Sequence, residues 1–141
     1  GLFWCWGVKY GLAEGNTIAG NRDYGISIGH NDTDNIMRKN SITDSGRVGI
    51  LFRNDARGVD FWANRNLVEK NLIKNSGDGD GVAIDVQGNT KDIRLIGNTL
   101  VESRAPMNRI GIRISAEAGS VEMRENQLDG FSEEIQDLRK S

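Results

Sequence analysis

The sequence predicts an all-β solenoid of about five coils, because two short motifs alternate along nearly the whole chain. The first motif is glycine, an apolar residue, any residue and another apolar residue. The second is asparagine, any residue and Ile or Leu. The copies of the first are "GLFW" at 1–4, "GISI" at 25–28, "GILF" at 49–52, "GVAI" at 81–84 and "GIRI" at 111–114. The copies of the second are "NTI" at 16–18, "NSI" at 40–42, "NLI" at 71–73, "NTL" at 98–100 and "NQL" at 126–128. Repeats of this length typically form one coil each.

The repeated pieces are predicted to be strands. Their apolar residues alternate with a period of two, which is the period of a strand and not of a helix. Glycine and asparagine recur every few residues and weaken helices. The connections contain no amphipathic helical pattern, which argues against a sheet built with crossover helices. We therefore expect the strands of successive coils to stack in parallel, so that like residues form ladders along the solenoid axis.

With these five paired motifs, residues 1–131 resemble the right-handed parallel β-helix family, whose fold pectate lyases, polygalacturonases and tailspike-like proteins share. The resemblance implies that the asparagines of the second motif stack as an internal ladder. Asparagine tolerates left-handed turn geometry, and we expect these residues to satisfy backbone groups of the turns through their amides. The fold hosts many chemistries, so it does not specify a reaction.

The length of 141 residues fits a single domain, 1–141, which we interpret as a piece of a longer solenoid because it opens on "GLFWCWG". Segment 131–141 mixes apolar and charged residues and is expected to form a last partial strand that caps the end. The exposed strand edges at the coil ends make self-association plausible. In the first coil, Trp4 is expected in the core and Phe3 on the outside.

Charge and hydropathy exclude two classes of partner. The net charge is −2, without the basic stripe of a nucleic-acid-binding protein. No apolar run approaches the roughly 20 residues of a membrane-spanning helix. Cys5 is the only cysteine, so no intrachain disulfide can form. A single cysteine leaves the compartment open, and we expect a secreted or cell-surface location.

Two connections are longer than the others. The larger insertion is "DARGVDFWANR" at 55–65, and the smaller is "SRAPMNR" at 103–109. Function on a solenoid usually lies on one lateral face or in loops of this kind. The "GDGDG" stretch at 77–81 is interpreted as a tight turn leading into a strand.

Aligning the strands by their glycines predicts an outward band of charged residues beside the larger insertion. In this alignment Arg53 and Asp85 are neighbours on adjacent coils, and Arg113 lies one coil further. Arginine can clamp a carboxylate, and aspartate can act as acid, base or calcium ligand. The candidate catalytic residues are His30, Arg53, Asp55, Asp85 and Arg113, and the candidate substrate-binding residues are Asp32, Trp62 and Gln87. The alternative is an exposed Arg53–Asp85 ion pair worth at most about 1 kcal/mol.

The only histidine, His30, lies in "YGISIGHNDTDN" at 24–35 and has two interpretations. It is either a general base beside Arg53 and Asp55, or a partly buried residue at the corner of a coil. A zinc site is not indicated, because there is no second histidine and Cys5 lies a full coil away. Calcium is the one cofactor candidate, although no cluster of acidic ligands like that of a pectate lyase is present.

Two functions remain open at this point. The first is a carbohydrate-active β-helix that binds or cleaves an acidic or neutral polysaccharide along an outward face, as a polysaccharide lyase or glycoside hydrolase if it is an enzyme. The second is a non-catalytic repeat module for adhesion, scaffolding or self-association. The polygalacturonase signature of paired aspartates, Gly-His-Gly and Arg-Ile-Lys is absent.

Overall fold

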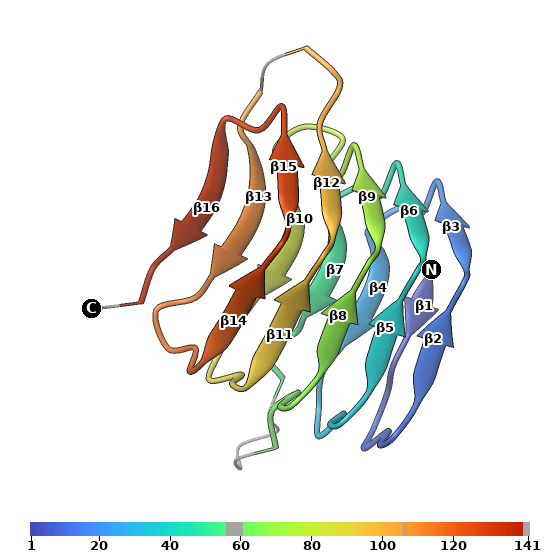
Figure 1. The fold of residues 1–141 in the computed structure, drawn as a ribbon, viewed down its shortest axis with the longest axis vertical. Helices are drawn as coiled ribbons and strands as arrows, with labels where there is room; N and C mark the ends of the chain where they lie inside the picture. Colours follow the sequence, from blue (N-terminus) through green and yellow to red (C-terminus); the bar gives the residue numbers. More distant parts are fainter. Residues whose placement is uncertain (56–60, 106, 140–141) are drawn as a thin grey trace.

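The computed structural model describes residues 1–55, 61–105 and 107–139, whose strands form three parallel sheets (Figure 1). A six-stranded sheet has the order β1 (Leu2–Phe3), β4 (Tyr24–Ile28), β7 (Val48–Phe52), β10 (Gly81–Val86), β13 (Arg109–Ile114) and β16 (Glu133–Asp137). A second sheet has the order β14 (Val121–Arg124), β11 (Ile93–Ile96), β8 (Leu67–Glu69), β5 (Ile36–Arg38) and β2 (Leu12–Glu14). The third has the order β15 (Gln127–Asp129), β12 (Thr99–Val101), β9 (Leu72–Lys74), β6 (Ser41–Thr43) and β3 (Thr17–Ala19).

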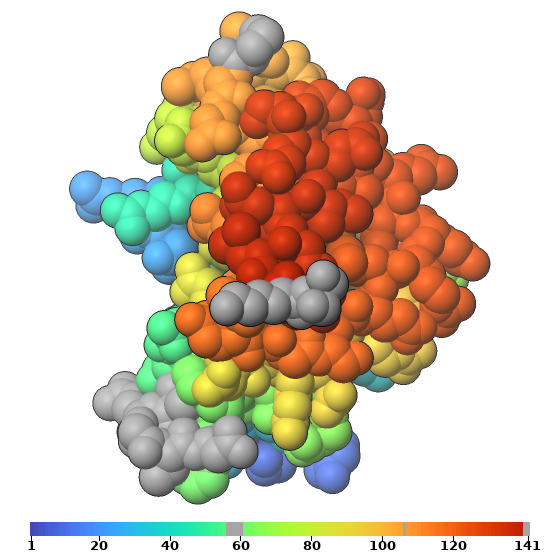
Figure 2. Space-filling model, turned by 90° about the vertical axis from the view of Figure 1, so that its left-hand side faces the viewer, coloured from blue at the N-terminus to red at the C-terminus, as the bar shows by residue number. Residues whose placement is uncertain are grey.

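Each coil of the solenoid contributes one strand to each sheet. In the described part of the chain, β1 to β15 make five such sets of three, and β16 begins a sixth. The two termini lie at opposite ends of the solenoid (Figure 1). Figure 2 looks onto the C-terminal end, where the orange and red residues of the last coils cover most of the view. The predicted all-β solenoid is therefore confirmed. No helix among the described residues is long and apolar enough to cross a membrane.

The asparagine ladder runs through all five coils on the inside of the solenoid. The side-chain Nδ2 of Asn40 donates to Oδ1 of Asn71 at 3.0 Å, and the backbone N–H of Asn40 donates to the same oxygen. The same pair of bonds joins Asn71 to Asn98. Equivalent bonds link Asn16 to Asn40 and Asn98 to Asn126. Each buried amide thus satisfies both a backbone group and the next amide, as buried polar groups require.

The left-handed corner lies one residue before each ladder asparagine. The positive φ angles fall on the residues directly before them, including Lys39 at 56° and Lys70 at 54°. The asparagine follows the corner, so its side chain points inward, where Nδ2 of Asn71 also donates to the carbonyl of Met37 at 3.0 Å. The corner residue and the ladder residue therefore have separate roles.

The glycines of the first motif make room for the apolar residues of the second. A methyl group on Gly49 would lie 2.5 Å from Cγ2 of Ile73, which is buried on the opposite side of the core. A methyl group on Gly25 would collide with Ile42 in the same way. The two motifs therefore recur together because each glycine faces an aliphatic side chain of the same core. Trp4 also packs in this core, at 7% exposure, as predicted.

The alignment of the fourth coil differs from the predicted one by two residues. Ile84 pairs with Ile50 and with Ile112, so Ala83, and not Gly81, occupies the row of Gly49. Alanine is small enough for this row, and Ala83 is buried. A side chain on Gly81 would instead collide with the carbonyl of Ser76 in the preceding turn. A shift of two residues keeps each side chain on its own face but changes its neighbours.

We predict that Asn71→Ala destabilises the protein by about 3 kcal/mol, because it leaves the buried donors of Asn40 and the carbonyl of Met37 unpaired. Urea unfolding followed by circular dichroism measures this loss. Asn16→Ala, at the end of the ladder, is the matched control and is expected to cost less than about 1 kcal/mol. Equal losses in the two variants would contradict the ladder as the source of the stability.

Candidate functional site

A groove of about 420 Å³ lies on the outward face of the six-stranded sheet. Its apolar floor is formed by Val48, Leu51, Val82 and Ile110. Its polar lining is formed by Tyr24, Arg47, Asp80, Asp85, Gln87, Asn108 and Arg113. These residues come from four adjacent strands and from the connections next to them, so the groove runs across the strands, along the solenoid axis. An apolar floor with a few convergent polar groups is the usual composition of a ligand site.

Asp85 and Arg113 form the central ion pair of the groove. Arg113 donates from Nε to Oδ1 at 3.2 Å and from Nη2 to Oδ2 at 2.8 Å. Gln87 donates from Nε2 to Oδ2 at 3.1 Å. Asp85 is 2% exposed, whereas the Arg113 side chain is 36% exposed. The hydrogen bonds to Asp85 raise the pKa of Arg113, although burial acts in the opposite direction. The pair therefore presents a fixed guanidinium to the groove and keeps the carboxylate beneath it.

The predicted pairing of Arg53 with Asp85 is wrong, because the shifted alignment places Asp85 beside Leu51 and Arg113. Arg53 turns the other way, toward the first two coils. Its Nη1 donates to the Ser27 hydroxyl at 2.8 Å and its Nη2 to the carbonyl of Trp4 at 3.0 Å. Burial lowers the pKa of Arg53, and the charges of Asp32 and Asp55 act against this effect. Arg53 therefore ties three coils together.

Asp32 and His30 lie inside the corner that follows β4. Asp32 is fully buried and accepts hydrogen bonds from the backbone N–H groups of Val8 at 2.8 Å and Gly29 at 3.0 Å. The His30 ring is 9% exposed and packs against Trp6, with a centroid distance of 4.7 Å, and against Phe61 at 5.6 Å. His30 thus matches the expected corner residue, and its role as a general base stays a prediction.

The larger insertion contributes Asp55 and Trp62 to the described structure, and its residues 56–60 lie outside it. Oδ2 of Asp55 lies 3.9 Å from Nε of Arg53, so Asp55 belongs to the Arg53 cluster. The Trp62 ring packs on Gly88, where any side chain would collide with it. Trp62 therefore packs on the corner directly after Gln87 and does not line the groove.

Seven of the eight predicted residues divide into two groups, and Trp62 belongs to neither. Asp85, Gln87 and Arg113 line the groove together. His30, Asp32, Arg53 and Asp55 lie at the corners after β4 and β7, where Arg53 pairs with Asp32 and Asp55, and His30 packs against Trp6 and Phe61. The geometry therefore does not place all eight candidate residues in one shared site.

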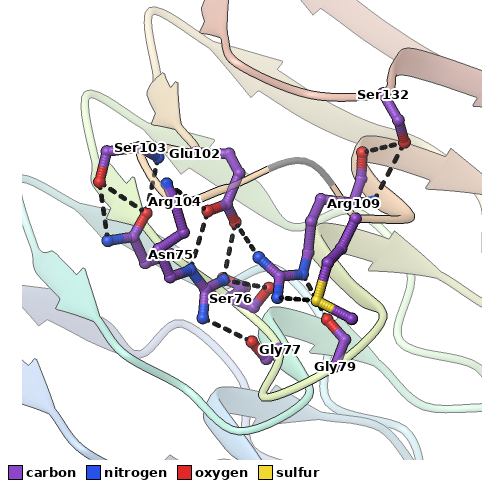
Figure 3. A network of polar contacts seen from close by, with 10 residues as sticks. Asn75, Ser76, Gly77, Gly79, Glu102, Ser103, Arg104, Arg109 and Ser132 are labelled. Atoms are coloured by element: carbon purple, nitrogen blue, oxygen red, sulfur yellow. Dashed lines mark hydrogen bonds and ion pairs between the residues drawn. The ribbon is translucent and has the colours of Figure 1, made fainter.

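A buried ion-pair network holds one wall of the groove (Figure 3). The Glu102 carboxylate lies between Arg104, at 2.7 Å, and Arg109, at 3.1 Å. Arg104 also donates to the carbonyl of Gly77 at 2.7 Å, and Arg109 donates to the carbonyl of Gly79. The network therefore fastens the smaller insertion to the "GDGDG" turn. These two segments supply Asn108 and Asp80 to the groove lining.

Sequence reasoning missed the groove residues near the start of each strand. Tyr24, Val48 and Ile110 stand directly before the glycines at 25, 49 and 111, so a regular outward row was visible in the repeat. The Glu102 network had no comparable signal, because its partners come from two irregular turns.

No group of three or more His, Cys, Asp or Glu side chains is placed to hold a metal ion in the described ranges. The calcium ion stays a prediction, and no chemical step is derived from it.

The fold and groove define a parallel β-helix with a lateral groove. The sequence matches the model of the family described as "Right handed beta helix region" over residues 3–134, and the chain belongs to this family. Among solved structures, it is similar to the crystal structure of the periplasmic alginate epimerase AlgG. The TM-score is 0.63 at 16% identity, over 91% of this chain and 36% of that one. At this identity the likeness shows the fold alone, and this chain spans about a third of the length of that protein. No curated protein matches the sequence.

We predict that Glu102→Gln destabilises the protein by about 3 kcal/mol at neutral pH, because Arg109 is left buried without its counter-charge. Burial acts to raise the pKa of Glu102, but hydrogen bonds from Arg104 and the charge of Arg109 outweigh it and hold the pKa below the usual 4.5. The stabilising effect of Glu102 is therefore complete above pH 4.5 and is lost as the pH falls through the lower pKa of the folded state.

The measurement is the free energy of unfolding of the wild type and of Glu102→Gln between pH 7 and pH 2. The difference between them should shrink below pH 4.5. Glu122→Gln removes an exposed carboxylate that pairs with Arg124, and it should cost about 0.5 kcal/mol or less. A difference between wild type and Glu102→Gln that is independent of pH would contradict the ionic role of Glu102.

Proposed function

We propose that the groove over β4, β7, β10 and β13 binds a polysaccharide. The observation that carries this proposal is the fixed Asp85–Arg113 pair beside an apolar floor. Sugars present both apolar ring faces and hydroxyl groups, and some also carry carboxylates. An arginine held in one orientation can bind a hydroxyl or carboxylate with little loss of side-chain entropy. The likeness to an alginate epimerase supports a carbohydrate as the ligand class.

Binding is favoured over cleavage by the state of Asp85. Its carboxylate already accepts three hydrogen bonds, two from Arg113 and one from Gln87. A general acid or base must instead exchange a proton with the substrate at hydrogen-bond distance. In this geometry Asp85 orients Arg113, and Arg113 and Gln87 contact the sugar. We also propose the secreted or cell-surface location in which such a polymer is met, consistent with the periplasmic location of the similar protein.

The test is binding of the protein to a panel of neutral and uronate-containing polysaccharides, measured by isothermal titration calorimetry. The informative variant is Asp85→Asn with Arg113→Gln, which removes both charges together and so leaves no buried charge unpaired. We expect this variant to keep the fold and to weaken binding at least about tenfold, which corresponds to about 1.4 kcal/mol. The lost hydrogen bonds between the charged Arg113 and the sugar account for this tenfold loss of affinity.

The matched control is Arg94→Gln with Glu122→Gln. This arginine–glutamate pair lies on β11 and β14, on a different sheet, with Nε and Oε1 separated by 3.5 Å. It should bind like the wild type. If the intact protein binds none of the polysaccharides, the proposal is overturned and the non-catalytic repeat module becomes the better interpretation. Equal losses in both double variants would also overturn the assignment to this groove.

A further inference from the structure

A second hollow lies on the same outward face, nearer the first coil. Its volume is about 260 Å³, and its lining includes Phe3, Ser27 and the turn 21–24. Tyr24 lines both this hollow and the larger groove. The two hollows therefore meet at one side chain.

The strand pairing places both hollows along a single outward row. Phe3 pairs with Ser27, Ser27 with Leu51, Leu51 with Asp85, and Asp85 with Arg113. Adjacent strands are about 4.8 Å apart, so a row across five strands extends roughly 19 Å. The row is continuous because each residue is the direct neighbour of the next. A polymer lying along the solenoid axis would contact both hollows in succession.

The second hollow offers an aromatic surface that is held in place. The Phe3 side chain is 61% exposed, and the Arg53 guanidinium lies 4.3 Å from the centre of its ring. A cation above one face of an aromatic ring is an attractive contact. Arg53 itself is fixed by its bonds to Ser27 and to the carbonyl of Trp4. Phe3 is thus oriented before any ligand arrives, which lowers the entropic cost of binding.

The charges along the row balance. Arg47 and Asp23 pair across the rim at 3.5 Å, and Arg113 is paired with Asp85. No excess of one sign is available to attract a polymer from a distance. Affinity must therefore come from the sum of hydrogen bonds and ring contacts along the row, and such a sum grows with the number of sugar units in contact.

We propose that the two hollows form one extended groove across β1, β4, β7, β10 and β13, which binds several consecutive sugar units of a glycan chain. Phe3 and Tyr24 contact sugar rings at the end near the first coil, and Arg53 is the positioning residue that orients Phe3. This inference rests on the proposed polysaccharide binding and adds the length of chain that the protein recognises.

The test uses oligosaccharides of increasing length, cut from a polysaccharide that the wild type binds. Affinity should rise with each added unit until both hollows are filled and then level off. Phe3→Ala should weaken binding of the longest oligosaccharide about fivefold, the size expected for losing one aromatic contact. It should leave binding of the shortest ones unchanged. Tyr10→Ala is the matched control, since Tyr10 is an exposed aromatic residue that lines neither hollow.

Arg53→Lys tests the positioning role, because lysine keeps the charge but not the two directed hydrogen bonds. It should weaken binding of long oligosaccharides more than short ones, whereas a purely structural role would lower the melting temperature without this dependence on length.

Affinity that is independent of length, or a Phe3→Ala variant that binds every length like the wild type, would overturn the extended groove while polysaccharide binding stands. A wild type that binds no glycan of any length would overturn the proposed function and the extended groove together.

Discussion

The outward surface of this protein depends on the asparagine ladder that fixes how its coils stack. Parallel strands with similar sequences can pair in several alignments, and an error of one residue would turn the core outward. The ladder opposes such errors, because the amide of Asn71 can satisfy the backbone N–H of Asn40 and the carbonyl of Met37 in only one alignment. Each misaligned step would leave these buried groups unpaired.

The ladder constrains one corner of each coil and leaves the opposite sheet freer to shift. Asn40 and Asn71 are 31 residues apart, and the stretch that separates them includes the long connection between β7 and β8. In the six-stranded sheet, the stretch between Ile50 and Ile84 includes the same connection but spans 34 residues, because the connection between β9 and β10 is longer as well. The alignment in the six-stranded sheet is therefore decided at the turn before β10, and its consequence is the contact between Asp85 and Arg113.

The sequence was sufficient to predict the fold and the face on which each strand residue lies. The repeats predicted stacked strands, an inward Trp4 and an outward Phe3, and the structure confirms these. The neighbours of Asp85 could not be predicted in the same way. The row of small residues accepts either glycine or alanine, and the fourth coil offers both, Gly81 and Ala83, two residues apart. Only the turn before β10, which has no space for a side chain on Gly81, distinguishes the two alignments.

The Glu102 network illustrates a second limit, because its members are brought together by two turns that break the repeat. Glu102 and Gly77 are 25 residues apart, and the residues that directly follow β3, β6, β9 and β15, at the position of Glu102, are not glutamates. A periodic pattern carries information only about the residues that share it. The wall of the groove, which these two turns form, is therefore specific to this chain, whereas the floor is formed by residues of the repeated strands.

The distinction between repeated strand positions and the turns that join them also explains what the chemically reactive residue types do in this structure. Asp32, His30 and Arg53 are the residues that chemistry would single out, yet they follow the strand ends, where the chain turns and its backbone groups need partners. Asp32 satisfies two backbone N–H groups there, and Arg53 satisfies a carbonyl. At these strand ends, the side chains of Asp32 and Arg53 are therefore already occupied by backbone groups.

A side chain on an outward strand that is paired on both sides has no backbone group to satisfy, because the neighbouring strands already satisfy the backbone. Arg113 is such a residue, and its partly exposed guanidinium is for that reason the better candidate for contact with a ligand.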